Sequence, residues 1–205
     1  MATGTAVQEW LRDAAQVFMD KAGELNDLDR GIGDGDHGAN MSRGLETALT
    51  IDMQADRSPN ESLRRVGMAL VSSVGGASGP LFGTFFLKVG QSWQSPPTTS
   101  SVAAAVRAGL DGVMARGKAV EGDKTMVDAL APAVASLEDS AASQVPLLEA
   151  LRLGAEAAEH GAEATLDMVA RRGRASYLGE RSVGHLDPGA VSSALILASA
   201  ARHIS

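Results

Sequence analysis

The chain has 205 residues, which is enough for one domain or, less readily, two. Hydrophobic residues make up 44% of it but aromatic ones only 3%, which favours closely packed helices, because strands favour aromatic and β-branched residues. The net charge of −7 argues against a dedicated surface for nucleic acid or an anionic membrane, and the lack of cysteine excludes disulfides and thiolate metal sites. The first ten residues do not resemble a signal peptide, and no apolar run approaches the ~18 residues of a membrane span, so we expect a cytoplasmic protein.

Apolar residues at helical spacing predict eight helices. They are expected at about 7–24, 41–58, 59–73, 80–93, 102–117, 125–137, 145–171 and 188–203, with Gly161 as a candidate interruption of the seventh. Ser58 and Asp187 each precede a proline at the first helical position, an arrangement typical of an N-cap. No strand pattern, linker or repeat divides the chain. We therefore predict a single all-α domain of eight helices over residues 1–205.

A dense acidic stretch, Asn26 to Arg43, carries Asp29, Asp34 and Asp36 separated by glycines. Aspartate and glycine are poor helix residues, so we expect a loop whose glycines let the three carboxylates converge. Converging carboxylates repel one another unless a cation lies between them, and an all-oxygen site suits Mg²⁺, or else Ca²⁺ or Mn²⁺. A solvated acidic loop is the alternative for an isolated DGD triplet, but the histidine and asparagine that follow favour a metal site.

An EF-hand does not fit this stretch. Counted from Asp34, the sixth residue is Ala39, where the motif needs glycine, and the twelfth is Leu45, where it needs a bidentate glutamate. Carboxylates that hold Mg²⁺ while the ion bridges to substrate phosphates fit better.

Three further loops are expected at 74–80, 116–124 and 173–188. Together with the acidic stretch they occupy alternate connections between the predicted helices. If successive helices run antiparallel, as short connections favour, all four loops lie at the same end of the bundle and can form one composite site.

The loop at 74–80 leads into a helix N-terminus, whose free N–H groups suit a phosphate, with Ser78 adding a hydroxyl. It lacks the lysine of a Walker A loop, and a purely structural glycine connection is the alternative. In the next loop Asp123 is a candidate cap for the sixth helix, and Lys124 could neutralise phosphate or simply be solvated. Met126 is more often a core residue than an adenine contact.

The last loop opens with a basic run, Arg171, Arg172 and Arg174, which could bind phosphate or complement the C-terminal dipole of the preceding helix. Tyr177 is expected to pack inside the protein. His37 is predicted to contact a phosphate oxygen, with no nucleophilic role assigned to it. From the residues alone, the four loops predict a Mg²⁺-dependent phosphate or nucleotide site but do not name the substrate.

These loops resemble those of DhaL, the nucleotide-binding subunit of dihydroxyacetone kinases. The matching stretches are LDRGIGDGDHGANMSRG, SSVGGASGPLFGTFF, RGKAVEGDKTMVDALAP and GRASYLGERSVGHLDPGA, which span residues 28–190. The resemblance implies a barrel of eight antiparallel helices in which Asp29, Asp34 and Asp36 coordinate two Mg²⁺ ions that bridge the phosphates of ADP or ATP. It further implies that the nucleotide is lined by His37, Gly38, Ala39, Asn40, Ala77, Ser78, Gly117, Met126, Arg174, Asp187, Pro188 and Gly189.

In that family the phosphoryl group passes to dihydroxyacetone held on a separate subunit, DhaK. The resemblance therefore implies a phosphotransferase subunit that is active only with a DhaK-like partner docked over the loop end. ADP is expected to be recharged in place by a phosphotransferase-system protein, DhaM. The alternatives are an ATP-dependent kinase subunit for another small ketose, a nucleotide-state sensor that acts on a transcriptional regulator, and the nucleotide domain of a fatty-acid kinase. A homodimer is also compatible with the sequence.

Overall fold

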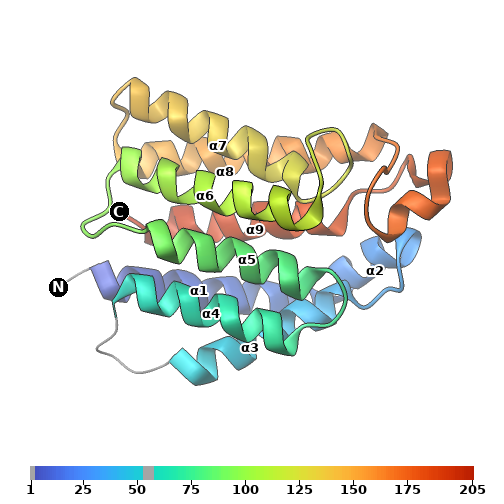
Figure 1. The fold of residues 1–205 in the computed structure, drawn as a ribbon, viewed down its shortest axis with the longest axis horizontal. Helices are drawn as coiled ribbons and strands as arrows, with labels where there is room; N and C mark the ends of the chain where they lie inside the picture. The colour runs from blue at the N-terminus through green and yellow to red at the C-terminus, as the bar shows by residue number, and fades with distance from the viewer. Residues whose placement is uncertain (1–2, 53–57) are drawn as a thin grey trace.

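The computed structural model describes residues 3–52 and 58–205, and within them the chain forms nine α-helices, two 3₁₀ helices and no strand (Figure 1). The α-helices are α1 (Thr3–Asp20), α2 (Ala22–Ile32), α3 (His37–Asp52), α4 (Pro59–Ser73), α5 (Ser78–Ser92), α6 (Thr99–Gly117), α7 (Val127–Ala142), α8 (Leu147–Ala164) and α9 (Pro188–His203). The 3₁₀ helices are η1 (Thr165–Asp167) and η2 (Arg174–Ser182). The all-α prediction is confirmed.

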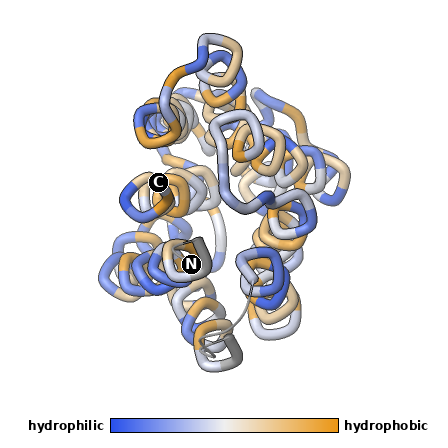
Figure 2. Tube along the Cα trace, turned by 90° about the vertical axis from the view of Figure 1, so that its left-hand side faces the viewer, coloured by the Kyte–Doolittle hydropathy of each residue, from blue (hydrophilic) through white to orange (hydrophobic). Residues whose placement is uncertain are grey.

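Most of the α-helices close a ring around a shared interior. Contacts run from α1 to α3, from α3 to α4, and on in chain order to α9, which packs back against α1. Figure 2 looks at this arrangement from the end that carries both chain termini. Helix α2 packs on α3, α9 and η2 and is the additional helix that the prediction of eight did not include. Among the described helices, none combines the length and the apolar composition that crossing a bilayer requires.

The connections that the sequence singled out gather at one end of the ring. In Figure 1 both termini lie at the opposite end, while the α2–α3, α4–α5 and α6–α7 connections and η2 lie together on the right. The prediction that alternate loops share an end is confirmed for these segments, because one cavity is lined by residues from all four of them.

The interior of the ring combines a few large aromatic side chains with many small residues. Phe85 and Phe86 pack edge to face with ring centroids 5.5 Å apart, and Phe86 also contacts Trp10 at 5.9 Å. A Cβ atom on Gly67 would lie 2.7 Å from the carbonyl oxygen of Gly83, so glycine is needed there for α4 and α5 to approach closely. Close backbone approach explains how a core with so few aromatic residues is filled.

The loop predicted at 26–43 is much shorter than expected. Only residues 33–36 separate α2 from α3, and the first predicted helix is instead divided at Lys21. Helix α2 continues to Ile32 because Leu25 and Ile32, two turns apart, are both buried. Their burial outweighs the low helix propensity of the glycine and aspartate residues between them.

The predicted ends of two other helices are also corrected. The helix expected to reach residue 171 ends at Ala164, and the Thr165 hydroxyl then donates to the Ala162 carbonyl at 2.6 Å as η1 begins. Gly161 does not interrupt α8: a Cβ atom there would lie 2.2 Å from the Asp128 carbonyl oxygen, so glycine lets α8 pack closely on α7. Helix α7 begins at Val127 rather than at 125.

Two of the three predicted helix caps are confirmed. The Ser58 hydroxyl accepts from the Glu61 amide, and the Asp187 carboxylate accepts from the Ala190 amide. Asp123 does not cap α7. Its carboxylate accepts from the Val120 amide at 2.9 Å, while the N-terminal side of α7 is held by Asp128, whose carboxylate accepts from the amides of Thr125 and Gly122 at 2.7 and 2.5 Å.

Candidate functional site

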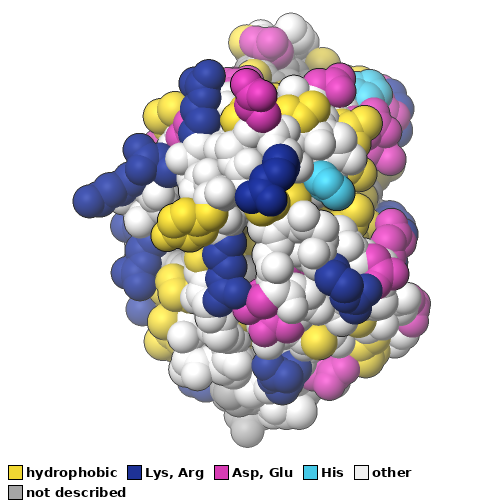
Figure 3. Space-filling view, turned by 90° about the vertical axis from the view of Figure 1, so that its right-hand side faces the viewer, with side chains coloured by type: hydrophobic (Ala, Val, Ile, Leu, Met, Phe, Trp, Pro, Cys, Tyr) yellow, Lys and Arg dark blue, Asp and Glu magenta, His cyan; other side chains and the backbone are white. Residues whose placement is uncertain are grey.

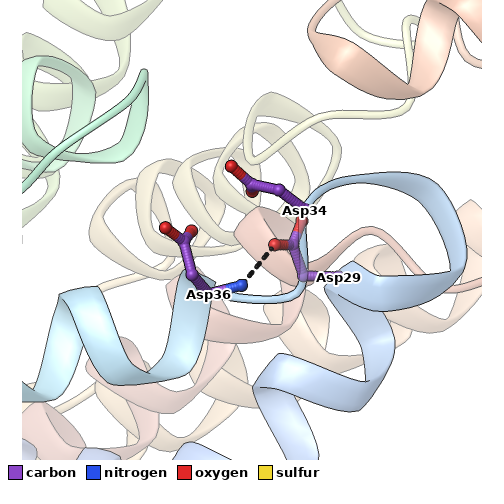
Figure 4. A group of neighbouring side chains, drawn as sticks. All are labelled: Asp29, Asp34 and Asp36. Carbon is purple, nitrogen blue, oxygen red and sulfur yellow. Dashed lines mark hydrogen bonds between the residues drawn. The ribbon is translucent and has the colours of Figure 1, made fainter.

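The three aspartates converge at the junction of α2 and α3. Asp29 lies in the last turn of α2, while Asp34 and Asp36 lie in the short connection, and each offers a carboxylate oxygen within 4.8 Å of the others (Figure 4). One oxygen of Asp29 accepts from the backbone amides of Gly35, Asp36 and His37 at 2.8, 3.1 and 3.4 Å. These hydrogen bonds to the Asp29 carboxylate hold the connection that carries Asp34 and Asp36 in its turn.

Glycine is required beside this carboxylate. A Cβ atom on Gly33 would lie 2.1 Å from Oδ1 of Asp29, and one on Gly38 would lie 2.2 Å from the carbonyl oxygen of Ala22. No L side chain fits either position without a shift of its neighbours. Gly33, which lies between two of the aspartates, thus allows close packing around Asp29, and Gly38 allows the start of α3 to pack closely on α2.

An arginine from the far loop lies against the aspartates. The Arg174 guanidinium forms an ion pair with the Asp34 carboxylate, which joins η2 to the α2–α3 connection. Burial would raise the pKa of the Asp34 carboxyl, but a hydrogen bond from its own backbone amide and the charge of Arg174 outweigh burial and hold that pKa below its usual range. Asp34 is thus an ionised group that already faces a cation.

A cavity of about 400 Å³ extends from the aspartate cluster into the end of the ring. Most of the residues predicted for the site line it, and they come from all four loops: Asp29, Asp34, Asp36, His37, Asn40, Ala77, Ser78, Gly117, Met126, Arg174, Asp187, Pro188 and Gly189. Gly38 and Ala39 are outside the lining. Gly38 packs on α2, and the Ala39 amide donates to the side-chain oxygen of Asn26 at 3.0 Å. Gly38 and Ala39 therefore pack the start of α3 against α2 and do not form part of the cavity wall.

The α4–α5 connection forms a wall of free backbone. A Cβ atom on Gly75 or Gly76 would meet no atom within 4 Å, so the chain here is open to the cavity. Ser78 is the first residue of α5, and the N–H groups of this first turn lack intrahelical partners. A helix N-terminus with open glycines before it attracts an anion.

His37 is buried at the back of the cavity, with 6% of its surface exposed. Its Nδ1 lies 3.0 Å from the Ser78 hydroxyl and its Nε2 lies 2.8 Å from the Ser192 hydroxyl. Burial lowers the pKa of the imidazole, against the opposing charges of Asp29 and Asp36. Ser192 was not singled out in the sequence, because an isolated serine in an amphipathic helix carries no signal there.

Lys124 lines the cavity but is not the solvated group considered from the sequence. Only 1% of its surface is exposed, and its ammonium donates to three backbone carbonyls, those of Thr165 at 2.6 Å, Met168 at 3.1 Å and His185 at 2.5 Å. Burial lowers the pKa of this ammonium, against the charges of Asp187 and Asp167. Lys124 is therefore a tie between the third and fourth loops rather than a solvated group.

A carboxyl group with a raised pKa and two further arginines also line the cavity. Burial raises the pKa of the Asp187 carboxyl to about 7, while its hydrogen bond from the Ala190 amide opposes the rise. Arg116 and Arg172 also line the cavity; Arg172 belongs to the basic run considered for phosphate binding, whereas Arg116 was not singled out for the site. Their signal was their place in the third and fourth loops. Met126, predicted as core or as a base contact, is 4% exposed and lines the cavity as well.

Tyr177 is not an interior residue, contrary to the prediction. Its surface is 88% exposed, because η2 buries only Ala175 and Ser182 among its members. Other large apolar side chains are exposed in the segments at this end of the molecule: Val120, Leu166, Val169 and Val183. Figure 3 looks onto this face, where arginine and lysine side chains stand among hydrophobic ones.

Comparison with known proteins identifies the family to which a chain with this site belongs. Residues 31–202 match the DAK2 domain family. The chain belongs to the DAK2 family. The ADP-binding subunit DhaL of the PEP-dependent dihydroxyacetone kinase of Escherichia coli strain K12 is 46% identical over 191 residues, 92% of this chain and 91% of that protein. The ADP-binding subunit DhaL of the PTS-dependent dihydroxyacetone kinase of Lactococcus lactis is 40% identical over 197 residues, 96% of this chain and 95% of that one.

The likeness of this DAK2 chain extends to a solved structure. The dihydroxyacetone kinase from C. freundii, solved in complex with AMP-PNP and Mg²⁺, superposes with a TM-score of 0.72 at 28% sequence identity. The match covers 98% of this chain and 34% of that one, so the DAK2 chain corresponds to about a third of the C. freundii protein. The resemblance to DhaL that the four loops indicated is confirmed.

Proposed function

We propose that this DAK2 chain is the nucleotide-binding subunit of a dihydroxyacetone kinase, and that it carries the phosphoryl group destined for dihydroxyacetone on a separate DhaK-like subunit. The observation that carries the proposal is the single cavity that joins the three aspartates to the glycine-rich start of α5 and to the arginines of the fourth loop. Acidic and basic side chains both line this cavity, and Asp34 and Arg174 form an ion pair within it. That pairing fits a divalent cation chelated to a polyphosphate.

The aspartate cluster suits Mg²⁺ by its chemistry. Its donors are all carboxylate oxygens within 4.8 Å of one another, and Asp34 already holds a cationic group, the guanidinium of Arg174. When bound there, Mg²⁺ would neutralise charge on the phosphates and on the transferring phosphoryl group. We propose two ions, because the carboxylates of Asp29, Asp34 and Asp36 together with phosphate oxygens offer enough ligands for both.

The other residues that line the cavity would contact the phosphates and the base of the nucleotide. The free amides at the start of α5 and the Ser78 hydroxyl face phosphate oxygens, and Arg172 and Arg174 add positive charge from the fourth loop. Met126, the partly buried Leu81 and the buried Phe82 line the cavity and provide apolar surface for a base. The chain's own residues thus bind the nucleotide, orient its phosphates and offset their charge.

The second substrate is proposed to arrive on a partner. Dihydroxyacetone would be held by a DhaK-like subunit docked over the loop end, where Tyr177, Val120 and Val169 are exposed beside arginines. Exposed aromatic and arginine side chains are enriched at protein interfaces. The bound ADP would be recharged in place by a DhaM-like phosphotransferase protein, as the names of the PEP- and PTS-dependent relatives suggest for those systems.

The first test is calorimetric titration with ADP, with and without Mg²⁺, after denaturing release has established which nucleotide the purified protein retains. We expect Mg²⁺-dependent binding, and we expect Asp34→Asn to weaken it by more than about tenfold. Asp27→Asn is the matched control, because Asp27 is an exposed helix carboxylate paired with Arg30 outside the cavity. ADP affinity and Mg²⁺ dependence that survive unchanged in Asp34→Asn would refute the proposed site.

The second test concerns the partner and the donor. Phosphorylation of dihydroxyacetone is expected only when a DhaK-like subunit is added. Stoichiometric ADP that survives purification supports recharging in place, whereas an empty site that exchanges ATP freely would show a nucleotide-exchanging kinase subunit instead. Binding of nucleotide without any activity on addition of the partner would contradict the kinase assignment.

A further inference from the structure

The buried imidazole of His37 connects the cavity to a residue that does not touch it. Nδ1 of His37 is hydrogen-bonded to the Ser78 hydroxyl, which lines the cavity, and Nε2 is hydrogen-bonded to the Ser192 hydroxyl on α9. Ser192 has no exposed surface, and it is absent from the cavity lining. The three side chains form a chain that runs from α9 through α3 to the first residue of α5.

The direction of the hydrogen bonds among these three side chains follows from which groups have a hydrogen to donate. A hydroxyl has one hydrogen to donate, and a buried hydrogen without an acceptor carries a desolvation penalty. Among the described residues, Nε2 of His37 is the hydrogen-bond partner found for the Ser192 hydroxyl. Ser192 therefore donates to Nε2, and Nε2 accepts.

A ring nitrogen that accepts fixes the role of the other one. In an imidazole whose Nε2 accepts, the ring proton is on Nδ1, and Nδ1 then donates to the Ser78 oxygen. The Ser78 hydroxyl has received a hydrogen bond and keeps its own hydrogen. In the opposite tautomer Ser78 would donate to Nδ1 and would offer the cavity only lone pairs, which repel an anion.

We propose that Ser192 is a positioning residue: by donating to Nε2 of His37 it holds the imidazole in its Nδ1–H form, so that the Ser78 hydroxyl points its hydrogen at the nucleotide phosphate. This rests on the proposed function for the identity of the anion. The hydrogen-bond direction itself does not, because it follows from the three side chains alone. Ser192 acts through His37 and does not touch the nucleotide.

A neighbouring serine provides the control. Ser193 is also buried on α9, with 1% of its surface exposed, but its hydroxyl donates to the Gly189 carbonyl of its own helix at 2.9 Å. Removing that hydroxyl deletes a local hydrogen bond and leaves His37 and its two partners in place. Ser192→Ala and Ser193→Ala thus delete the same atoms at adjacent buried positions, and only the first disconnects His37.

The deciding experiment is ¹⁵N NMR of the imidazole nitrogens, in which protonated and bare ring nitrogens resonate far apart. The chain has four histidines, so the His37 signals are those that vanish in His37→Gln. We expect a protonated Nδ1 and a bare Nε2 in the wild type and in Ser193→Ala, and loss of this preference in Ser192→Ala. A protonated Nε2 in the wild type, or an unchanged spectrum in Ser192→Ala, would overturn the inference.

The functional consequence is measured separately by titration with ADP and Mg²⁺. Loss of one charge-assisted hydrogen bond predicts about tenfold weaker ADP binding in Ser192→Ala and unchanged binding in Ser193→Ala. Equal affinities of the two variants would overturn the positioning role. If the wild type does not bind ADP, the proposed function fails, while the tautomer measurement still decides the hydrogen-bond direction.

Discussion

The ammonium of Lys124 lies 2.5 Å from the carbonyl oxygen of His185, sixty-one residues further along the chain. The same ammonium donates to the carbonyls of Thr165 and Met168. Thr165 in turn accepts, through its hydroxyl, from the amide of Asp187 at 2.9 Å. One buried cation therefore holds the segment that leads into η2 and the segment that leads into α9 against the α6–α7 connection.

Replacing this lysine should destabilise the protein and loosen the cavity together. Lys124→Met leaves three buried carbonyls without their donor, and we expect a loss of about 3 kcal/mol in the free energy of unfolding. Chemical denaturation measures it. Lys88→Met, at an exposed position on α5, is the control and should change stability by less than about 0.5 kcal/mol. Equal stability of the two variants would show that the tie contributes little.

Gly33 should be essential for the aspartate cluster. In Gly33→Ala the new Cβ would start 2.1 Å from Oδ1 of Asp29 and 3.1 Å from its carbonyl oxygen, so the Asp29 carboxylate must move. We expect a loss of about 1–2 kcal/mol in the free energy of unfolding and a loss of Mg²⁺-dependent ADP binding. Chemical denaturation measures the first and calorimetric titration the second. Gly23→Ala, on α2 with no atom within 4 Å of the new Cβ, should be neutral or stabilising by up to about 1 kcal/mol. Wild-type binding by Gly33→Ala would contradict the placement of Asp29.

The raised pKa of Asp187 makes a prediction about pH. Burial raises it from 3.8 to about 7, so between these values the folded chain holds a proton that the unfolded chain has lost. Stability contributed by this group is therefore present at low pH and is lost as the pH rises from about 4 to about 7. Asp187→Asn lacks the titration and can still cap α9.

The measurement for Asp187 is the free energy of unfolding of both proteins at about pH 5 and about pH 8. Relative to the wild type, Asp187→Asn should be more stable at the higher pH than at the lower one. A difference between the two proteins that does not vary with pH would show that the Asp187 carboxyl is ionised throughout this range, and one that varies in the opposite direction would contradict its raised pKa.

The exposed Tyr177 should matter for a partner and not for the nucleotide. Tyr177→Ala removes an 88% exposed ring from η2, so ADP affinity and thermal stability should remain at wild-type values. Kinase activity with a DhaK-like subunit should fall severalfold, because an aromatic anchor at an interface contributes about 1–2 kcal/mol. Met68→Ala, which also removes an exposed apolar side chain but from α4 and outside the cavity lining, is the control. Full activity of Tyr177→Ala at limiting partner concentration would remove Tyr177 from the proposed interface.

Local chemistry in the sequence was enough to predict the kind of fold and many of the residues that line the cavity. Period-3.6 apolar spacing gave the helical class, and the positions of Ser58 and Asp187 before proline gave two helix starts, because caps are set by side chains adjacent in the chain. The loops that carry Asp34 and Ser78 fall in alternate connections between helices. This predicted that both loops lie at one end of the bundle, because short connections restrict how consecutive helices can run.

Tertiary structure decided what depends on partners distant in the chain. Burial of Leu25 and Ile32 kept α2 helical through residues that prefer loops, and this put Asp29 on a helix rather than in a loop. Whether Lys124 is solvated depends on three carbonyls more than forty residues away, and whether Tyr177 is packed depends on which face η2 presents to α2. The sequence by itself indicated many of the residues that line the cavity. Only the packing of distant segments decided which of them face the cavity and which hold it in shape, because burial and hydrogen bonding are properties of neighbours that the chain brings together on folding.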